Sequence, residues 1–599
     1  MMQPSPRSGT DLVLGAIAIL ILLSGVLWLG GAISALLSQH KIPDGHFFAG
    51  LSSLSDPSDP SKSWHTPVGS SVLYWSVTSL VVGVAGLLTF LGVRLFRNVF
   101  SGTLNKSPLK AQGLASRSEI RVAASQKSLM KRASTLRPSL LKPKPGDIGY
   151  LIGIGNGIPC WASVEDSMLL LGPPRSGKGT NVVIPMILDA PGALVTTSTR
   201  PDNLAVTFDA RKKRGPVAIF DPQGLARSAS LPSTMKWSLT RGCIDPQNAI
   251  VRAEALVGET LKSGVENGSF WRQQALAVTR ALLQAGALDN RPPSDLYRWS
   301  HFAGAAKEAV NILSTNNGST PGWGSALDAI ISADQRTRDS VWAMVANTFA
   351  PLSDPSVLAS VSPRENESFD PQTFLKENGT LFLLGSASGA SSTSTLVAAL
   401  IEDVINAARH EAAKCIGQRL DPPLSLVLDE AANYPLPSLP SLMSEGGGSG
   451  IMTLAVLQSL SQARDRWGRE AAGAIWDSAI IKIVLGGSSN ADDLSDISRL
   501  IGDRELKEWS ETRQGGLGCS MSSSTKRIPI LEPSEIRKLP IGHGLLLLRA
   551  SAPVIVRLQP WTKRKDRKEL IASKSRFEET IDTGEPSCDD ICEGVQEHA

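Results

Sequence analysis

Cysteine, histidine and tyrosine are scarce in this chain of 599 residues, which holds six cysteines, seven histidines and four tyrosines. So few cysteines, scattered along the chain, do not build the disulfide framework of a small secreted protein. Cys588 and Cys592 stand close together, but no second Cys or His pair lies near them, so a zinc site of the usual spacing is not indicated. The cysteine usage therefore favours a reducing compartment.

Charged residues are missing from the centre of two long apolar runs, which cover about 12–37 and 72–95. Each run is long enough to cross a bilayer, and Tyr74 and Trp75 near one end of the second are typical of a membrane interface. Without charges the runs are expected to anchor the protein rather than to form an ion path. A cleaved signal peptide is the alternative for the first run, but the run is too long and a second one follows.

Acidic residues are almost absent after the second run, where Glu119 is the single acid beside twelve Lys and Arg residues between 94 and 144. The positive-inside rule places this basic cluster in the cytoplasm. Residues 1–97 are thus predicted to form a membrane anchor whose loop 38–71 lies outside, with both termini inside. Residues 98–145 are predicted to be a basic juxtamembrane linker that attracts anionic lipid, with a nucleic-acid contact as the alternative.

From residue 146 the pattern becomes α/β. Seven short apolar runs are typical of buried strands: 168–171, 193–197, 217–220, 381–384, 424–428, 452–457 and 480–485. Continuous apolar strands separated by helical stretches predict a mostly parallel sheet that is covered on both faces. Two further runs, 544–548 and 554–558, are predicted to form an edge hairpin.

Between residues 245 and 370 this alternation stops, and apolar residues recur at helical spacing. Examples are Trp271, Ala275, Val278 and Leu282. The spacing predicts an all-α domain, so the α/β domain is expected in two pieces, 146–244 and 371–560. Residues 561–599 are charged and end in an acidic stretch, which predicts a disordered tail. Capture of a basic partner is the alternative for that stretch.

A glycine-rich loop follows the first of the buried strands. It reads Gly172-Pro173-Pro174-Arg175-Ser176-Gly177-Lys178-Gly179-Thr180. A strand, a tight loop and a helix start offer an anion a cradle of backbone N–H groups, and Lys178 is predicted to reach the β- and γ-phosphates of ATP. Most such loops place the Mg²⁺-binding hydroxyl directly after the lysine. Here Gly179 occupies that position, so Thr180 is the candidate ligand.

Two carboxylates, Asp429 and Glu430, end the apolar run 424–428. In P-loop ATPases an acid at this place holds Mg²⁺, so Asp429 is predicted to position the metal and Glu430 to activate water. Gln458 ends the run 452–457 and is predicted to sense the γ-phosphate or to orient water. Open α/β sheets bind ligands at the carboxyl ends of their strands, so these residues are expected beside Lys178.

In these residues the chain resembles the type IV secretion coupling proteins of the TraG/TraD family, within the FtsK/HerA-like P-loop ATPases. The resemblance rests on the glycine-rich loop, Phe270-Trp271, Leu428–Asn433, Gly450-Ile451 through Gln462, and Glu532–Pro540. It implies a RecA-like ATPase domain with an inserted all-α domain that recognises DNA and substrate, and a homo-hexamer.

The resemblance also implies a function and a location. ATP hydrolysis, with Mg²⁺, would recruit DNA, a relaxase bound to single-stranded DNA, or protein substrates and move them into a secretion channel. The chain would lie in the bacterial inner membrane with two spans and most of its residues in the cytoplasm. Channel components would be its partners.

Two departures keep rival functions open. Family members often carry an arginine before the Gly-Ile pair, but Glu445–Gly450 contains none, so an arginine finger would come from elsewhere, with Arg464 and Arg466 nearest. An FtsK-like translocase of double-stranded DNA is one alternative, which the two spans and the helical insertion disfavour. A non-hydrolysing membrane adaptor that docks secretion substrates is the other, favoured by Gly179 and disfavoured by the intact Lys178.

Overall fold

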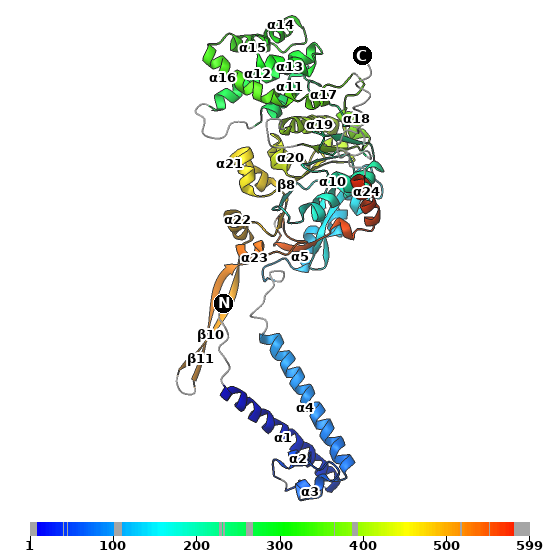
Figure 1. The fold of residues 1–599 in the computed structure, drawn as a ribbon, viewed down its shortest axis with the longest axis vertical. Helices are drawn as coiled ribbons and strands as arrows, with labels where there is room; N and C mark the ends of the chain where they lie inside the picture. Colours follow the sequence, from blue (N-terminus) through cyan, green and yellow to red (C-terminus); the bar gives the residue numbers. More distant parts are fainter. Residues whose placement is uncertain are drawn as a thin grey trace, which may run out of the picture. The chain divides into compact units, whose positions relative to one another are not determined.

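The computed structural model describes residues 9–39, 41–44, 46–100, 111–226, 231, 234–258, 268–364, 366–385, 393–514, 518–549 and 551–579. The chain divides into two compact units, Met1–Ser107 and Pro108–Ala599. Figure 1 shows the ribbon of both units.

The first unit is built on two long helices, α1 (Gly9–Gln39) and α4 (Ser71–Phe100). Both are long and apolar enough to cross a membrane. The short helices α2 (Ala49–Ser52) and α3 (Pro60–Trp64) lie between them. Trp64 is fully buried, and its Nε1 donates to the Tyr74 hydroxyl at 3.2 Å. The polar stretch between the two helices therefore folds around a tryptophan that packs on the helix pair.

Eleven strands form the main sheet of the second unit, in the order β2-β1-β13-β12-β9-β3-β8-β7-β4-β6-β5. Their bounds are β1 (Gly149–Gly155), β2 (Ile158–Ser163), β3 (Met168–Leu171), β4 (Leu194–Ser198), β5 (Val217–Phe220), β6 (Thr380–Leu384), β7 (Leu424–Leu428), β8 (Ile451–Leu457), β9 (Ile481–Leu485), β12 (His543–Leu548) and β13 (Val554–Leu558). The strands from β9 to β5 are parallel. They are the seven apolar runs of the sequence, so the predicted α/β sheet is confirmed.

Both faces of this sheet are buried because successive side chains of β3 enter different cores. Leu169 and Leu171 belong to a core shared with α19 (Ser394–Lys414), whereas Met168 and Leu170 pack in a core with Ile187 of α9 (Ile184–Asp189). A strand buried on both sides needs apolar residues at every position. This explains why the parallel strands read as continuous apolar runs.

The β12–β13 hairpin lies inside the sheet, so the predicted edge position is wrong. β12 pairs with β9, and β13 pairs with β1, both antiparallel. Strands β1 and β2 then continue the sheet. Strand β1 contains glycines and so lacks a continuous apolar run. Strands β1 and β13 approach closely there: a Cβ on Gly153 would lie 2.7 Å from the Arg557 carbonyl oxygen.

An insertion of helices fills the connection between β5 and β6. Its helices are α11 (Pro246–Val257), α12 (Gly268–Leu288), α13 (Pro293–His301), α14 (Lys307–Thr315), α15 (Trp323–Ile331), α16 (Gln335–Phe349) and α17 (Pro355–Ser360). Figure 1 shows α11–α16 gathered beside α19 at one end of the second unit. The chain enters and leaves side by side, because the Trp237 N–H donates to the Ser360 carbonyl and the Phe369 N–H to that of Lys236.

The folded unit begins earlier than the predicted boundary at residue 146. Helices α5 (Arg117–Ala124), α6 (Gln126–Met130) and α7 (Ala133–Leu136) pack on the sheet through buried Ile120, Leu129 and Leu136. Arg117, Arg121, Lys127 and Lys131 are exposed, and such basic residues dominate the composition of the stretch, which explains the prediction of a linker. Residues 101–110 lie outside the described part of the chain.

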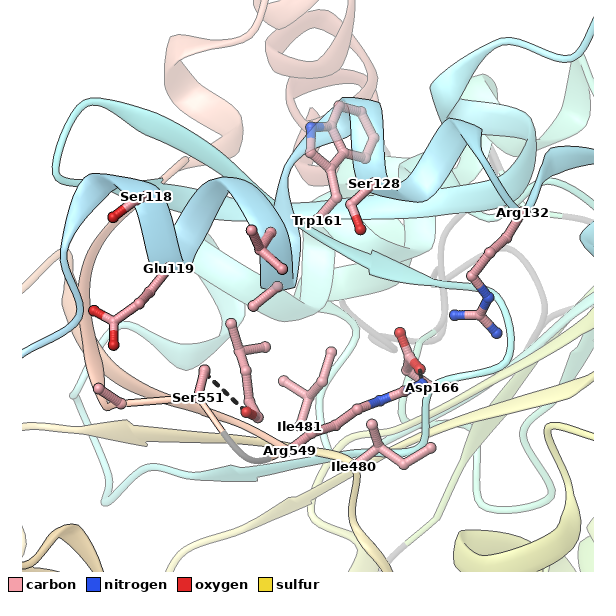
Figure 2. Close-up of a pocket in the computed structure, with 14 residues that line it drawn as sticks. Ser118, Glu119, Ser128, Arg132, Trp161, Asp166, Ile480, Ile481, Arg549 and Ser551 are labelled. Atoms are coloured by element: carbon pink, nitrogen blue, oxygen red, sulfur yellow. Dashed lines mark hydrogen bonds and ion pairs between the residues drawn. The ribbon is translucent and has the colours of Figure 1, made fainter.

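A cavity of about 650 Å³ opens between α5–α6 and the sheet. Figure 2 shows Trp161 and Arg132 along one side of it, and Ile480, Ile481 and Arg549 along the other. Since Ile481 is the first residue of β9, which runs parallel to β3, the cavity lies at the opposite edge of the sheet from the loop that follows β3. It is therefore not the nucleotide site.

The C-terminal region contains a helix, so the prediction of disorder is wrong for residues 561–579. Helix α24 (Arg567–Glu579) packs on α10 (Asp202–Lys212). Its Leu570 and Phe577 are buried against apolar residues of α10. Residues 580–599, with the acidic stretch and two of the cysteines, lie outside the described part of the chain.

A separate two-stranded sheet, β10 (Asp503–Gln514) with β11 (Gly518–Pro529), follows α22 (Ala491–Ile501). The sequence analysis did not predict it, because its strands carry polar residues without an apolar run. The second unit also contains helices α8 (Pro145–Ile148), α18 (Pro371–Lys376), α20 (Leu439–Glu445), α21 (Leu460–Ser478) and α23 (Pro533–Arg537).

Removing the Leu570 side chain tests the docking of α24. Leu570 is 2% exposed, whereas the neighbouring Ile571 is 49% exposed. Leu570→Ala is expected to destabilise the helix–helix contact by about 2–5 kcal/mol and to speed hydrogen exchange of the α24 amides. Ile571→Ala is the matched control and should leave exchange unchanged. Equal exchange in both variants would contradict the docking.

Candidate nucleotide-binding site

The glycine-rich loop and the other two predicted segments meet at one edge of the sheet. β3 pairs with β8, and β8 pairs with β7, all in parallel, so the three strands end together. The Gly172 N–H, directly after β3, donates to the carbonyl of Leu457, the last residue of β8, at 2.9 Å. The fold thus brings Gly172–Thr180, Gln458 and Asp429 to the same edge.

The backbone of the loop depends on glycine at position 177. Gly177 has φ +83°, and a Cβ there would lie 2.6 Å from Nδ2 of Asn181, which donates to the Gly177 carbonyl at 2.8 Å. Arg175 also adopts a left-handed conformation, with φ +63°. After Lys178 the chain makes a π-helical turn, Gly179–Val183, before α9 begins. A π turn adds a residue to the turn and often marks a functional site.

Lys178 lies between the two strand-end carboxylates. Its Nζ is 3.2 Å from Oε1 of Glu430 and 3.9 Å from Oδ1 of Asp429. The lysine side chain is 14% exposed, so water screens these attractions less than at an open surface. The ammonium group is therefore held over the edge where phosphates would enter the loop.

Asp429 is buried, and its Oδ1, 3.9 Å from Nζ of Lys178, is the oxygen that is available to a metal ion. Asn203 donates to its Oδ2 at 3.2 Å, whereas Oδ1 has no hydrogen-bond partner among the described residues. Burial raises the pKa of the Asp429 carboxyl, the Glu430 carboxylate adds to the rise, and Lys178 opposes it. A buried carboxylate oxygen without a donor fits Mg²⁺, which prefers carboxylate ligands.

Glu430 is held by two side chains that the sequence analysis missed. Its Oε2 accepts from Nδ2 of Asn433 at 2.8 Å and from Oγ1 of Thr199 at 3.2 Å. Glu430 itself has φ +54°, an uncommon backbone conformation that is frequent at functional sites. Thr199 follows the end of β4, and its position after a buried strand was the available signal.

Thr180 and Gln458 lie at the same edge without a side-chain hydrogen bond to the carboxylates among the described residues. Thr180 is exposed and Gln458 is half-buried, and no hydrogen bond in the described part of the chain joins either side chain to Asp429 or Glu430. Gln458 lines a small space with Pro173 at the foot of the loop. The metal role of Thr180 and the water-orienting role of Gln458 stay predictions.

Ser176, Arg464 and Arg466 differ in their surroundings. The Ser176 hydroxyl is buried in the loop without a hydrogen-bond partner among the described residues, which suits a group that would meet a phosphate. Arg464, considered above for an arginine finger, pairs with Asp493 of the same chain at 3.3 Å. Arg466 is exposed, and its role as a finger stays a prediction.

Comparisons with known proteins give the same family as the motifs. A family model described as "TraM recognition site of TraD and TraG" matches residues 423–541. The "Conjugal transfer protein TraG" of Agrobacterium fabrum (strain C58 / ATCC 33970) is 21% identical over 416 residues, which are 67% of this chain and 61% of that protein. This chain is a relative of the TraG/TraD coupling proteins. The match thus spans less than two thirds of the TraG relative's own length.

The fold is also that of a solved coupling protein. The unbound form of TrwBdeltaN70 matches with a TM-score of 0.50 and 17% identity, over 71% of this chain and 91% of that one. Its complex with the non-hydrolysable ATP analogue ADPNP matches with a TM-score of 0.50 and 18% identity, over 71% and 92%. The predicted P-loop ATPase fold is therefore confirmed, and the TraG/TraD match includes Asp429, Glu430 and Gln458.

Two glycines of the loop are expected to respond differently to a methyl group. Gly177→Ala places a side chain at a left-handed position and against Asn181, so nucleotide affinity should fall by about tenfold or more, since such a conformation alone costs about 1–2 kcal/mol. At Gly179 the nearest atom to a Cβ is Oδ1 of Asn203 at 3.8 Å, so Gly179→Ala should bind as the parent does. Titration with a fluorescent ATP analogue measures both; equal affinities would contradict the loop geometry.

Proposed function

We propose that this chain is a membrane-anchored coupling ATPase, which uses ATP hydrolysis to recruit DNA or protein substrates and to move them into a secretion channel. The observation that carries the proposal is the position of Lys178, with Nζ 3.9 Å from Asp429 and 3.2 Å from Glu430 at the loop edge. Such an arrangement in a relative of the coupling proteins favours hydrolysis over nucleotide storage.

The residues have separable tasks in this proposal. Lys178 leaves Glu430 for the β- and γ-phosphates, while the loop N–H groups from Gly177 to Thr180 hold the remaining phosphate oxygens. Asp429 Oδ1, with Thr180 as the second candidate, would hold Mg²⁺, which supplies charge neutralisation when bound. Glu430 accepts a proton from the attacking water. The water oxygen then bonds to the γ-phosphorus, the bond between the γ-phosphorus and the β-phosphate oxygen breaks, and ADP leaves. Gln458 orients that water.

The relatives support a proposal for the substrate and the partners. One relative is named for conjugal transfer, and the matching family model for recognition of TraM. We therefore propose DNA, single-stranded and attached to a relaxase, as the cargo, and channel components as partners. Helices α1 and α4 would fix a homo-hexamer in the bacterial inner membrane, with the second unit in the cytoplasm. Contacts to DNA phosphates would be salt-sensitive and independent of sequence.

A non-hydrolysing adaptor is the second candidate, because Gly179 removes the usual hydroxyl and Thr180 makes no hydrogen bond to Asp429 in the described part of the chain. It would bind ATP to hold its shape and dock substrates without turnover. An FtsK-like translocase would hydrolyse ATP but prefer duplex DNA. One assay distinguishes both alternatives from the coupling ATPase.

That assay is ATP hydrolysis by the full chain in detergent, without DNA and with single- or double-stranded DNA. Glu430→Gln is expected to keep ATP binding and to lower kcat about 10²- to 10⁴-fold, the usual contribution of a general base. Lys178→Ala should lose affinity and turnover together. Turnover that is absent in the parent, or unchanged by Lys178→Ala, would favour the adaptor, and stimulation by duplex DNA alone would favour the translocase.

The metal role of Thr180 is tested by moving the hydroxyl. Thr180→Ala is expected to raise the Mg²⁺ concentration for half-maximal turnover on the order of tenfold. The double variant Gly179→Ser with Thr180→Ala should restore it, because a side chain at 179 has room. An unchanged Mg²⁺ requirement in Thr180→Ala would exclude this hydroxyl as a ligand.

A further inference from the structure

Glu430 is connected to the all-α insertion by a short series of hydrogen bonds and ion pairs. We propose that Asn433 positions Glu430 for catalysis, and that α19 makes this position depend on the insertion. The inference rests on the proposed function and adds the means by which cargo on the insertion would control hydrolysis. Asn433 is a positioning residue here, since it acts through Glu430.

The two oxygens of the Glu430 carboxylate have different partners. Oε1 accepts from Lys178, whereas Oε2 accepts from Asn433 and Thr199. When phosphates draw Lys178 away, Oε1 loses its donor while Oε2 keeps both. The carboxylate is then prevented from rotating, and its free oxygen faces the phosphates, where it can accept a proton from water. The amide of Asn433 therefore selects which oxygen acts.

The backbone of Asn433 is fixed from α19 and from the sheet. Its carbonyl accepts from Oγ of Ser394, the first residue of α19, at 2.5 Å. The next residue, Tyr434, is 1% exposed, and its hydroxyl donates to the carbonyls of Gly385 and Ser198. Ser198 is the last residue of β4, and Gly385 directly follows β6. Asn433 thus stands between the sheet, which holds Thr199, and the first turn of α19.

Further along α19, Asp403 is paired with the insertion. Its Oδ1 lies 2.7 Å from Nη2 of Arg252 on α11, and its Oδ2 accepts from Nε1 of Trp237 at 2.9 Å. Arg252 is 2% exposed and stacks on the Trp237 ring at 4.6 Å. A buried ion pair resists separation strongly, so α11 and α19 are expected to move together.

Helix α19 connects the Asp403 pairing to Ser394. Ser394 and Asp403 are nine residues apart on one helix, a rise of about 14 Å. A displacement of α11 by bound cargo would therefore shift the Ser394 end of α19 and with it the Asn433 carbonyl. The insertion would act on the orientation of Glu430 without touching the nucleotide.

The first test separates positioning from phosphate binding in the full chain in lipid nanodiscs. Asn433→Ala is expected to lower kcat at least tenfold and to leave KM for ATP unchanged, because Asn433 contacts Glu430 and not the loop. Thr199→Val removes the other donor to the same oxygen and should act in the same direction. Asn311→Ala, at an exposed position on α14, is the control.

The second test concerns the connection to the insertion. Ser394→Ala is expected to reduce the stimulation of kcat by single-stranded DNA at least threefold, with the melting temperature unchanged. If turnover depends on Lys178 but is equal in the parent, Asn433→Ala and Thr199→Val, this inference is overturned and the proposed function stands. A rise of KM equal to the fall of kcat, or full stimulation in Ser394→Ala, would also overturn the inference. Absence of Lys178-dependent turnover in the parent would overturn the proposed function and this inference with it.

Discussion

The candidate site depends on the parallel hydrogen bonding of β3, β8 and β7. Neighbouring strands are about 4.8 Å apart, so the loop after β3 and the acids after β7 begin about 10 Å from each other with β8 between them. Lys178 bridges that gap, since its Nζ lies 3.2 Å from Glu430. A change in strand order would separate the glycine-rich loop from Asp429 and Glu430, whatever residues the strands contain.

Much of this sheet could be predicted because burial on both faces leaves a strong signal in each strand by itself. The seven parallel strands are continuous apolar runs, and Asp429 and Glu430 stand directly after one of them. Pairing across the chain leaves no such local signal. The β12–β13 hairpin was therefore placed at an edge, although β9 and β1 flank it. Gly153 in β1 reflects a close approach of Arg557, which only the pairing explains.

Thr199 and Asn433 were not predicted for the same reason. Thr199 and Asn433 come from segments more than 230 residues apart, yet both donate to one oxygen of Glu430. Nothing in either segment alone indicates that partner. In the same way, α5–α7 were hidden in a basic stretch, because their buried residues, such as Ile120 and Leu129, are few beside the charged ones that face solvent.

The entry and exit of the helical insertion are joined by the bonds from Trp237 to Ser360 and from Phe369 to Lys236. A module whose two ends touch can be lengthened, shortened or exchanged without changing the register of any strand in the sheet. The helical insertion and the sheet that carries the candidate nucleotide site are therefore separate modules of one chain. Under the proposed function, exchanging the insertion between related proteins would change cargo preference and leave the geometry of the sheet in place, provided that the α11–α19 pairing is preserved.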